Sequence, residues 1–226
     1  MSLPKSITAD TGMDVLTHAT EAYVSTLASD FTDGLALQAV KMVFEYLPRA
    51  VNNGKNDPEA REKMHNASTL AGMAFANAFL GVNHSLAHKI GGEYHVPHGR
   101  ANAILMPHVI RYNGTKPEKP GIWPKYNYYK ADQKYYELAC AIGLKPNNVQ
   151  EGVELYAKAC GDLGIDCGIK MSFKDQGLDE KTYMDNLDKI AYLAYEDQCS
   201  PANPRVPMVE EMKEILVKAY NGYTKE

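Results

Sequence analysis

The sequence predicts an all-α fold, a helical bundle that spans residues 1–226, and three observations indicate it. Apolar residues recur at steps of three and four along most of the chain, which is the spacing that places side chains on one face of a helix. Residues that cap helices, and prolines, stand where these stretches begin. No apolar-polar alternation typical of a half-buried strand pair is present, and no Asn-Gly pair joins two apolar runs as in a β-hairpin.

The first half of the chain gives three helices. A periodic stretch over residues 10–28 predicts the first, and Asp33 is a candidate cap for the second, which should bend or end near Pro48. Asp57-Pro58-Glu59 combines an N-cap, a proline at the first helical position and an acid near the positive end of the helix dipole. The alanine-rich run 64–80 that follows is apolar on most sides, so we expect a central buried helix.

The second half predicts shorter helices around one long loop. Residues 113–130 hold three prolines and no period, which indicates a loop, and a second proline-rich loop spans 200–207. The predicted helices are 85–94, 99–112, 132–142, 147–163, 179–197 and 207–221.

Composition excludes several classes of protein. The 226 residues can bury a proper core, and 24 Lys+Arg against 28 Asp+Glu give a net charge of −4, which argues against nucleic acid or an anionic membrane as partner. No apolar run approaches the roughly 18 residues of a membrane span. The cysteines are scattered, which indicates a reducing compartment, so we expect a cytoplasmic protein. They are Cys140, Cys160, Cys167 and Cys199.

Histidines cluster in a way that favours a metal site. Asp14 and His18 lie four residues apart on the first predicted helix, and His84 and His88 repeat that spacing on another. A carboxylate with three imidazoles suits Fe(II) or Zn(II). An Asp–His pair at this spacing is, however, more often a hydrogen-bonded pair without a metal, and spacing alone does not choose the ligands. The candidates are Asp14, His18, His84, His88, His95 and His98.

Other candidate sites have simpler interpretations. His65 and His108 fit surface or core positions, and Cys160 and Cys167 fit the core. No G-x-G-x-x-G or G-x-x-x-x-G-K-[ST] motif provides a phosphate-binding loop. The tyrosines of the long loop region suit packing of the loop better than base stacking, given the net charge. They are Tyr112, Tyr126, Tyr128, Tyr129, Tyr135 and Tyr136.

Three strings resemble the iron-containing (group III) alcohol dehydrogenases, and the likeness covers nearly the whole chain. They are Thr8-Ala-Asp-Thr-Gly-Met-Asp-Val-Leu-Thr-His-Ala-Thr-Glu-Ala-Tyr23, His84-Ser-Leu-Ala-His88-Lys-Ile-Gly-Gly and Pro97-His-Gly-Arg-Ala-Asn-Ala-Ile104. Trp123-Pro-Lys-Tyr-Asn-Tyr-Tyr-Lys-Ala131 and Asp197-Gln-Cys-Ser-Pro-Ala-Asn-Pro-Arg205 resemble, more narrowly, the alcohol dehydrogenase half of the bifunctional aldehyde–alcohol dehydrogenase branch.

The resemblance implies a helical metal-binding domain that, in the family, follows a nucleotide-binding domain absent from this sequence. Carried over by position, the metal ligands fall on Asp14, His18, His84 and His98, and the histidine near nicotinamide and substrate falls on His88. Phe75 and Cys199 match positions that line the substrate pocket. His95 has no ligand role in the family.

The resemblance implies reduction of an aldehyde to its primary alcohol with Fe(II) and NAD(H), and acetaldehyde is the expected substrate. The activity is expected of a longer parent enzyme that forms a homo-oligomer. His88 would relay the proton. Zn(II) remains open as the metal, and lactaldehyde, glycerol or butanal remain open as substrates. A helical metal-dependent hydrolase, which needs a second metal or an extra carboxylate, and a non-catalytic assembly module are the alternatives from other classes.

Overall fold

The structure is a computed structural model that describes residues 3–117 and 129–225. Within these ranges the chain forms ten α-helices and one 3-10 turn and no strand, so the predicted all-α class is confirmed. The helices are α1 (Lys5–Val24), α2 (Asp30–Asn53), α3 (Pro58–Ala78), α4 (Val82–Tyr94), α5 (His98–Asn113), α6 (Ala131–Ala141), α7 (Val149–Asp166), α8 (Glu180–Asp185), α9 (Leu187–Tyr195) and α10 (Val209–Asn221), with the 3-10 turn at Ser200–Ala202.

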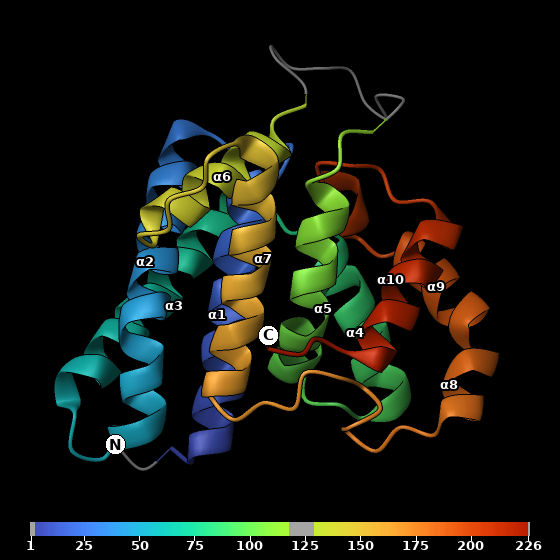
Figure 1. The fold of residues 1–226 in the computed structure, drawn as a ribbon, viewed down its shortest axis with the longest axis horizontal. Helices are drawn as coiled ribbons and strands as arrows, with labels where there is room; N and C mark the ends of the chain where they lie inside the picture. The colour runs from blue at the N-terminus through green and yellow to red at the C-terminus, as the bar shows by residue number, and fades with distance from the viewer. Residues whose placement is uncertain (1–2, 118–128, 226) are drawn as a thin grey trace.

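The helices form two groups that share α5 (Figure 1). Helices α1, α2, α3, α6 and α7 enclose one apolar core, and α4, α8, α9 and α10 enclose the other. Helix α5 lies between them because it is apolar on two faces: Met106 and Ile110 belong to the first core, and Ile104 and Leu105 to the second. The junction of the two groups therefore runs along α1, α4 and α5.

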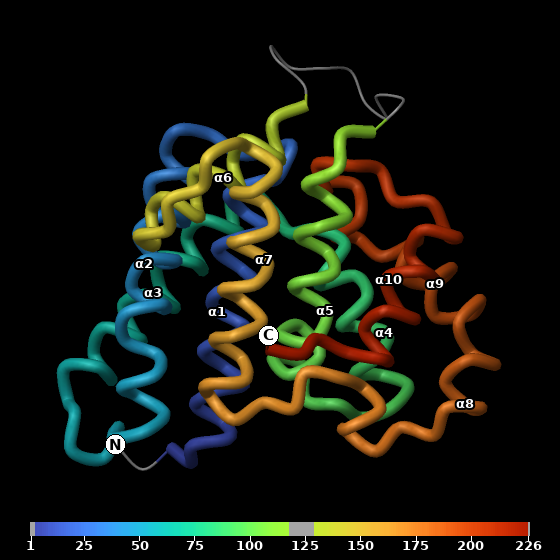
Figure 2. Tube along the Cα trace, in the orientation of Figure 1, coloured from blue at the N-terminus to red at the C-terminus, as the bar shows by residue number. Residues whose placement is uncertain are grey.

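The end of the chain ties the two groups together. Residues 222–225 run from α10 back toward α7 (Figure 2). There the Tyr223 amide donates to the Met171 carbonyl at 2.9 Å, and the Tyr223 hydroxyl donates to Asp162 of α7 at 2.8 Å. These contacts connect the segment after α10 to α7 and to the segment that follows it.

Several predicted helix boundaries are wrong, and capping explains them. The first helix runs from Lys5 to Val24 rather than over 10–28. The second is capped by Ser29 rather than Asp33: the Ser29 side chain accepts from the Thr32 amide, and the Thr32 hydroxyl accepts from the Ser29 amide. That helix also continues through Pro48 to Asn53, because buried residues beyond the proline offset the lost hydrogen bond. The Asp57 cap with Pro58 at the first position is confirmed.

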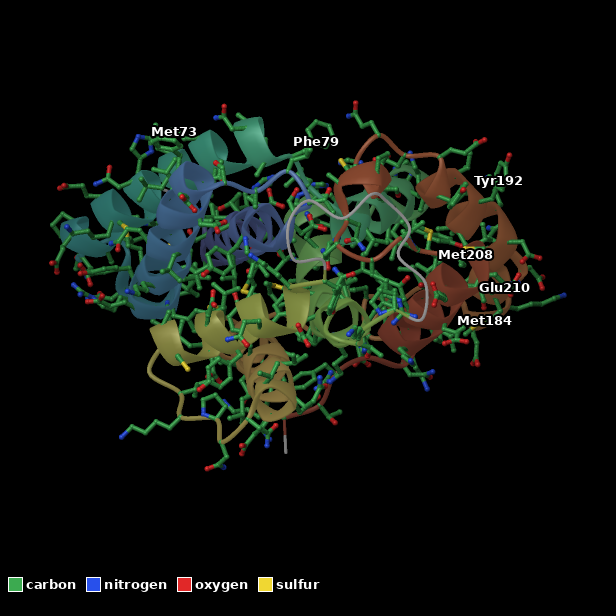
Figure 3. The ribbon with its side chains drawn as sticks, turned by 90° about the horizontal axis from the view of Figure 1, so that it is seen from above. Met73, Phe79, Met184, Tyr192, Met208 and Glu210 are labelled. Carbon is green, nitrogen blue, oxygen red and sulfur yellow. The ribbon has the colours of Figure 1, made fainter. Side chains whose placement is uncertain are left out.

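Helix α3 is not the central buried helix that its composition indicates. Its buried residues form a stripe of alanines that packs on α1 and α2, while Met73 is 51% exposed. Figure 3 labels Met73 on the outer side of the molecule. The alanines of α3 therefore allow close packing against α1 and α2, while the other face of the helix stays exposed.

The predicted helix over 179–197 is two helices. Asn186 caps the end of α8, where its backbone N–H donates a hydrogen bond to the Tyr183 carbonyl, and α9 begins at Leu187. Most of the predicted 113–130 loop, with Tyr126 and Tyr128, lies outside the described residues. No helix in the described part of the chain is long and apolar enough to span a membrane.

The beginning of α5 lies directly against α1 at Gly99. A Cβ atom added there would lie 2.0 Å from the Asp10 carbonyl oxygen and 3.2 Å from the Asp14 Cβ. Only glycine therefore allows α5 to approach α1 this closely, which brings the neighbouring His98 to Asp14.

We expect Gly99→Ala to lower the free energy of unfolding by about 1–3 kcal/mol, because the added methyl group clashes with backbone that cannot move freely. Urea unfolding of the variant beside Gly92→Ala provides the measurement. Gly92 is also helical but has open space around its Cβ position, so its replacement should leave stability unchanged or slightly higher. Equal stability of Gly99→Ala and the parent protein would contradict this account of the α1–α5 contact.

Candidate metal centre

Three of the predicted ligands converge at the junction of the two helix groups. Asp14 Oδ1 of α1 lies 3.7 Å from His84 Nε2 of α4 and 3.4 Å from His98 Nε2 of α5. One ligand atom from each of these residues lies within 4.8 Å of the other two. The three residues come from three helices, and the fold brings them together.

His18 lies beside this group, one turn after Asp14. Its Nδ1 is 3.8 Å from Asp14 Oδ2, and its ring stacks between His84 and Phe75, with centroids 4.5 Å from each. The structure thus brings Asp14, His18, His84 and His98 into one cluster, with Phe75 against it.

Two residues of the cluster, Asp14 and His18, line a cleft between α1 and α3. The cleft has a volume of about 500 Å³, and Asp14 and His18 form part of its lining on the α1 side. His65, Ser68 and Arg61 of α3 line the opposite side. A small molecule entering this cleft would meet the carboxylate and the His18 imidazole.

Glu21 holds His84 from the buried side. His84 Nδ1 donates to Glu21 Oε2, while Glu21 Oε1 accepts from the amide of Asn83 at 2.8 Å. The carboxylate therefore caps the N-terminus of α4, where Gly81 offers no side chain, and fixes the His84 tautomer with Nε2 facing Asp14. Carboxylates in this position orient the histidines of metal sites.

Asn102 shows that the three acceptor atoms point to one place. Its amide nitrogen lies 2.7 Å from Asp14 Oδ1, 3.2 Å from His84 Nε2 and 3.1 Å from His98 Nε2. Asn102 Oδ1 accepts from the Asn83 side chain at 2.9 Å, which fixes the amide orientation. Lone pairs from one carboxylate and two imidazoles therefore converge on a single donor, and this donor set fits a divalent transition metal.

The protonation states of the cluster show which residue must lose a proton before a cation can bind. Burial lowers the pKa of His84, but the negative charges of Glu21 and Asp14 outweigh burial and raise it to about 9. Burial and the charge of His84 lower the pKa of His18 to about 4. Burial raises the pKa of Asp14, yet its interactions with His84 and His18 bring it down to about 2. At neutral pH Asp14 is an anion and His18 a neutral imidazole. His84 is protonated at neutral pH, so a metal ion that binds its Nε2 must displace a proton.

His88 lies one turn after His84, with its ring stacked on His98 at 5.5 Å between centroids. Its Nδ1 donates to Asp197 Oδ2 at 3.1 Å, and the Lys89 ammonium donates to the same oxygen at 2.7 Å. Cys199 is buried beside them, and burial raises the pKa of its thiol to about 12. The structure thus places the predicted pocket residue Cys199 near His88.

The remaining histidines lie outside the ligand cluster. His95 ends α4 in the left-handed conformation, with φ of 56°, so its position is structural. His65 lines the cleft, and His108 is largely buried on α5, where burial lowers its pKa to about 4. Cys160 and Cys167 are free thiols in the core, as predicted.

Sequence reasoning missed the residues that support the ligands. Glu21 follows His18 by three residues and Asp14 by seven, which is the spacing of one helix face, so its position could have been found. Asn102 follows His98 by four residues and could have been found in the same way. Asp197 contacts His88 from 109 residues away, and no local pattern indicates that contact.

Comparisons with known proteins agree with the geometry. Residues 8–220 match the sequence profile of the Fe-containing alcohol dehydrogenase family, C-terminal part. The chain is 63% identical to the aldehyde-alcohol dehydrogenase of Streptococcus pneumoniae over 99% of this chain and 25% of that protein. It therefore spans about a quarter of the length of such relatives.

Solved structures share the fold of this chain. A 1,3-propanediol oxidoreductase is 37% identical and superimposes with a TM-score of 0.85 over 96% of this chain and 53% of its own. A sulfoacetaldehyde reductase from Bifidobacterium kashiwanohense, solved in complex with NAD+, is 28% identical with a TM-score of 0.78 over 97% of this chain and 51% of its own. The chain spans about half the length of these structures.

Proposed function

Because the chain belongs to the Fe-containing alcohol dehydrogenase family, we propose that it forms the metal-binding part of an enzyme that interconverts an aldehyde and its primary alcohol with NAD(H). The observation that carries the proposal is the convergence of Asp14, His84 and His98 beside His18, with Asp14 and His18 also lining an open cleft. We propose Fe(II) as the metal and acetaldehyde as the substrate.

Asp14, His18, His84 and His98 would hold the cation. When bound there, the cation supplies a Lewis acid that polarises a carbonyl oxygen. Glu21 keeps the lone pair of His84 aimed at the cluster, and Phe75 packs on the His18 ring and limits its rotation. The chain's own contribution is thus an anion and three oriented imidazoles at the junction of three helices.

His88 is the proposed proton relay. Its ring lies against His98 but is not needed to complete the ligand set, and its side chain is one-third exposed. With Nδ1–H bonded to Asp197, Nε2 is the nitrogen that can take up a proton from water and then pass it to the oxygen of the reduced substrate, returning to its unprotonated form. Phe75, which packs on His18, and Cys199, which lies near His88, are the proposed substrate-pocket residues.

The hydride comes from the nicotinamide, and we propose that NAD(H) is held chiefly by residues outside this chain. No Gly-rich phosphate-binding motif is present in the sequence, and the chain spans about half the length of the 1,3-propanediol oxidoreductase. The NAD+ complex of the sulfoacetaldehyde reductase supports this choice of cofactor.

NADH oxidation by the full-length enzyme that contains this chain tests the proposal. We expect turnover with acetaldehyde only after loading with Fe(II) under anaerobic conditions, and no turnover by the 226-residue chain alone. Propanal, butanal, lactaldehyde and, in the reverse direction, glycerol give the substrate comparison. Unchanged turnover after chelation, or ester or phosphate hydrolysis without nicotinamide, would overturn the proposal and favour a hydrolase.

A further inference from the structure

We propose that Asp197 is a positioning residue for His88. Its carboxylate holds the His88 proton on Nδ1, which leaves Nε2 as the nitrogen that takes up a proton and passes it on. The inference rests on the proposed function, because it assigns to Asp197 a part in the reaction through His88. Its geometry, however, depends only on the described residues of this chain.

Asp197 has the geometry of an orienting carboxylate. It is 9% exposed, and its Oδ2 accepts from His88 Nδ1 at 3.1 Å. Its Oδ1 accepts from the Cys199 amide at 3.0 Å, so the carboxylate plane is held by the backbone after α9. A buried carboxylate held in this way can accept a hydrogen bond but not donate one, and His88 must therefore carry its proton on Nδ1.

Lys89 keeps the carboxylate in this role. Its ammonium lies 2.7 Å from Asp197 Oδ2 and offsets the negative charge that would otherwise be buried without a countercharge. Lys89 and His88 are consecutive in α4, so the helix presents both donors to one acceptor. His88 Nε2 lies on the side of the ring away from Asp197 and takes no part in this hydrogen bond.

The alternative is a purely structural role, in which Asp197 caps the turn at Cys199 and pairs with Lys89. The two roles differ in what Asp197→Asn does. Asparagine keeps the shape and can still accept from Lys89 or Cys199, but its amide can donate to His88 Nδ1 and move the proton to Nε2. In the catalytic triad of serine proteases, replacing the aspartate by asparagine likewise leaves the geometry intact and yields the wrong histidine tautomer.

Nitrogen-15 NMR of the histidine-labelled 226-residue chain measures the tautomer directly, without nicotinamide or turnover. We expect His88 in the Nδ1–H form in the parent protein and a shift to the Nε2–H form in Asp197→Asn. His88→Ala identifies the signal. Lys89→Met, which removes another partner of the same carboxylate, should keep the Nδ1–H form. An Nε2–H form of His88 in the parent protein would overturn the inference whether or not any variant folds.

Rates of the full-length enzyme provide the second measurement. We expect Asp197→Asn to lower kcat by a factor that approaches, and does not exceed, the loss in His88→Ala, which should be about 10²- to 10⁴-fold. KM and bound metal should stay nearly unchanged. In the His88→Ala background, Asp197→Asn should cost nothing further. Asp33→Asn, which alters a carboxylate paired with Lys134 away from the site, is the matched control.

The outcomes separate this inference from the proposed function. If His88→Ala leaves the rate per bound metal unchanged, the proposed role of His88 is wrong. If His88→Ala slows turnover but Asp197→Asn does not, or if the two losses multiply in the double variant, the positioning role of Asp197 alone is wrong.

Discussion

His84→Ala is expected to remove most metal from the protein. The affinity of the remaining three-residue site for the metal should be weaker by more than about 100-fold. Loss of a residue that only supports a ligand already costs about 10- to 100-fold in metal affinity, and His84 would itself be a ligand. The variant should also unfold more easily. Removing His84 leaves the buried Glu21 carboxylate without its imidazole partner, and breaking such a pair costs about 3–5 kcal/mol.

Metal content per chain and competition with a chromogenic chelator measure the effect. His98→Ala separates ligand loss from unfolding, because His98 lies at the exposed rim and its removal leaves no buried charge unpaired. His65→Ala, which removes a histidine from the same cleft, should bind metal as the parent protein does. Full metal occupancy in the double variant His18→Ala/His84→Ala would show that the assigned ligand set is wrong.

The fold class could be predicted because helix periodicity and capping are local signals. Asp57 and Pro58 mark the start of α3 in the sequence, and the structure has the helix there. The extent of α2 could not be read in the same way, since the residues after Pro48 stay helical through tertiary burial and not through propensity. The exposure of Met73 also depends on which neighbours pack beside α3, and the sequence does not contain that information locally.

The residues of the site, like those of the fold, could be predicted where the signal is local and not where it depends on contacts between distant segments. Helical spacing pairs Asp14 with His18 and His84 with His88, and it could have added Glu21, yet spacing alone left six candidates for one ion. The choice among them came from resemblance to a family. What spacing could not supply is the contact of Asp197 with His88 and the close approach of α5 to α1 at Gly99, because both depend on elements far apart in the chain.

In the full-length enzyme, His88→Ala should slow turnover by about 10²- to 10⁴-fold while metal content stays nearly unchanged, because general acid–base groups typically contribute that much. The structure gives His88 no hydrogen bond to the proposed ligands: its hydrogen-bond partner is Asp197, and its ring packs on the rings of His98 and His84. A water molecule that takes over the proton would put the loss at the lower end of the range.

Rate per bound metal, measured beside metal content, decides between a relay and a residue that supports a ligand. If His88 only orients His98, metal affinity should fall together with rate. Chemical rescue sharpens the test, because the side chain of His88 is one-third exposed and its removal opens space that solvent can reach. Added imidazole should restore part of the rate in His88→Ala and none in His84→Ala, whose site is buried. An unchanged rate per bound metal in His88→Ala would show that the proton reaches the substrate oxygen by another route.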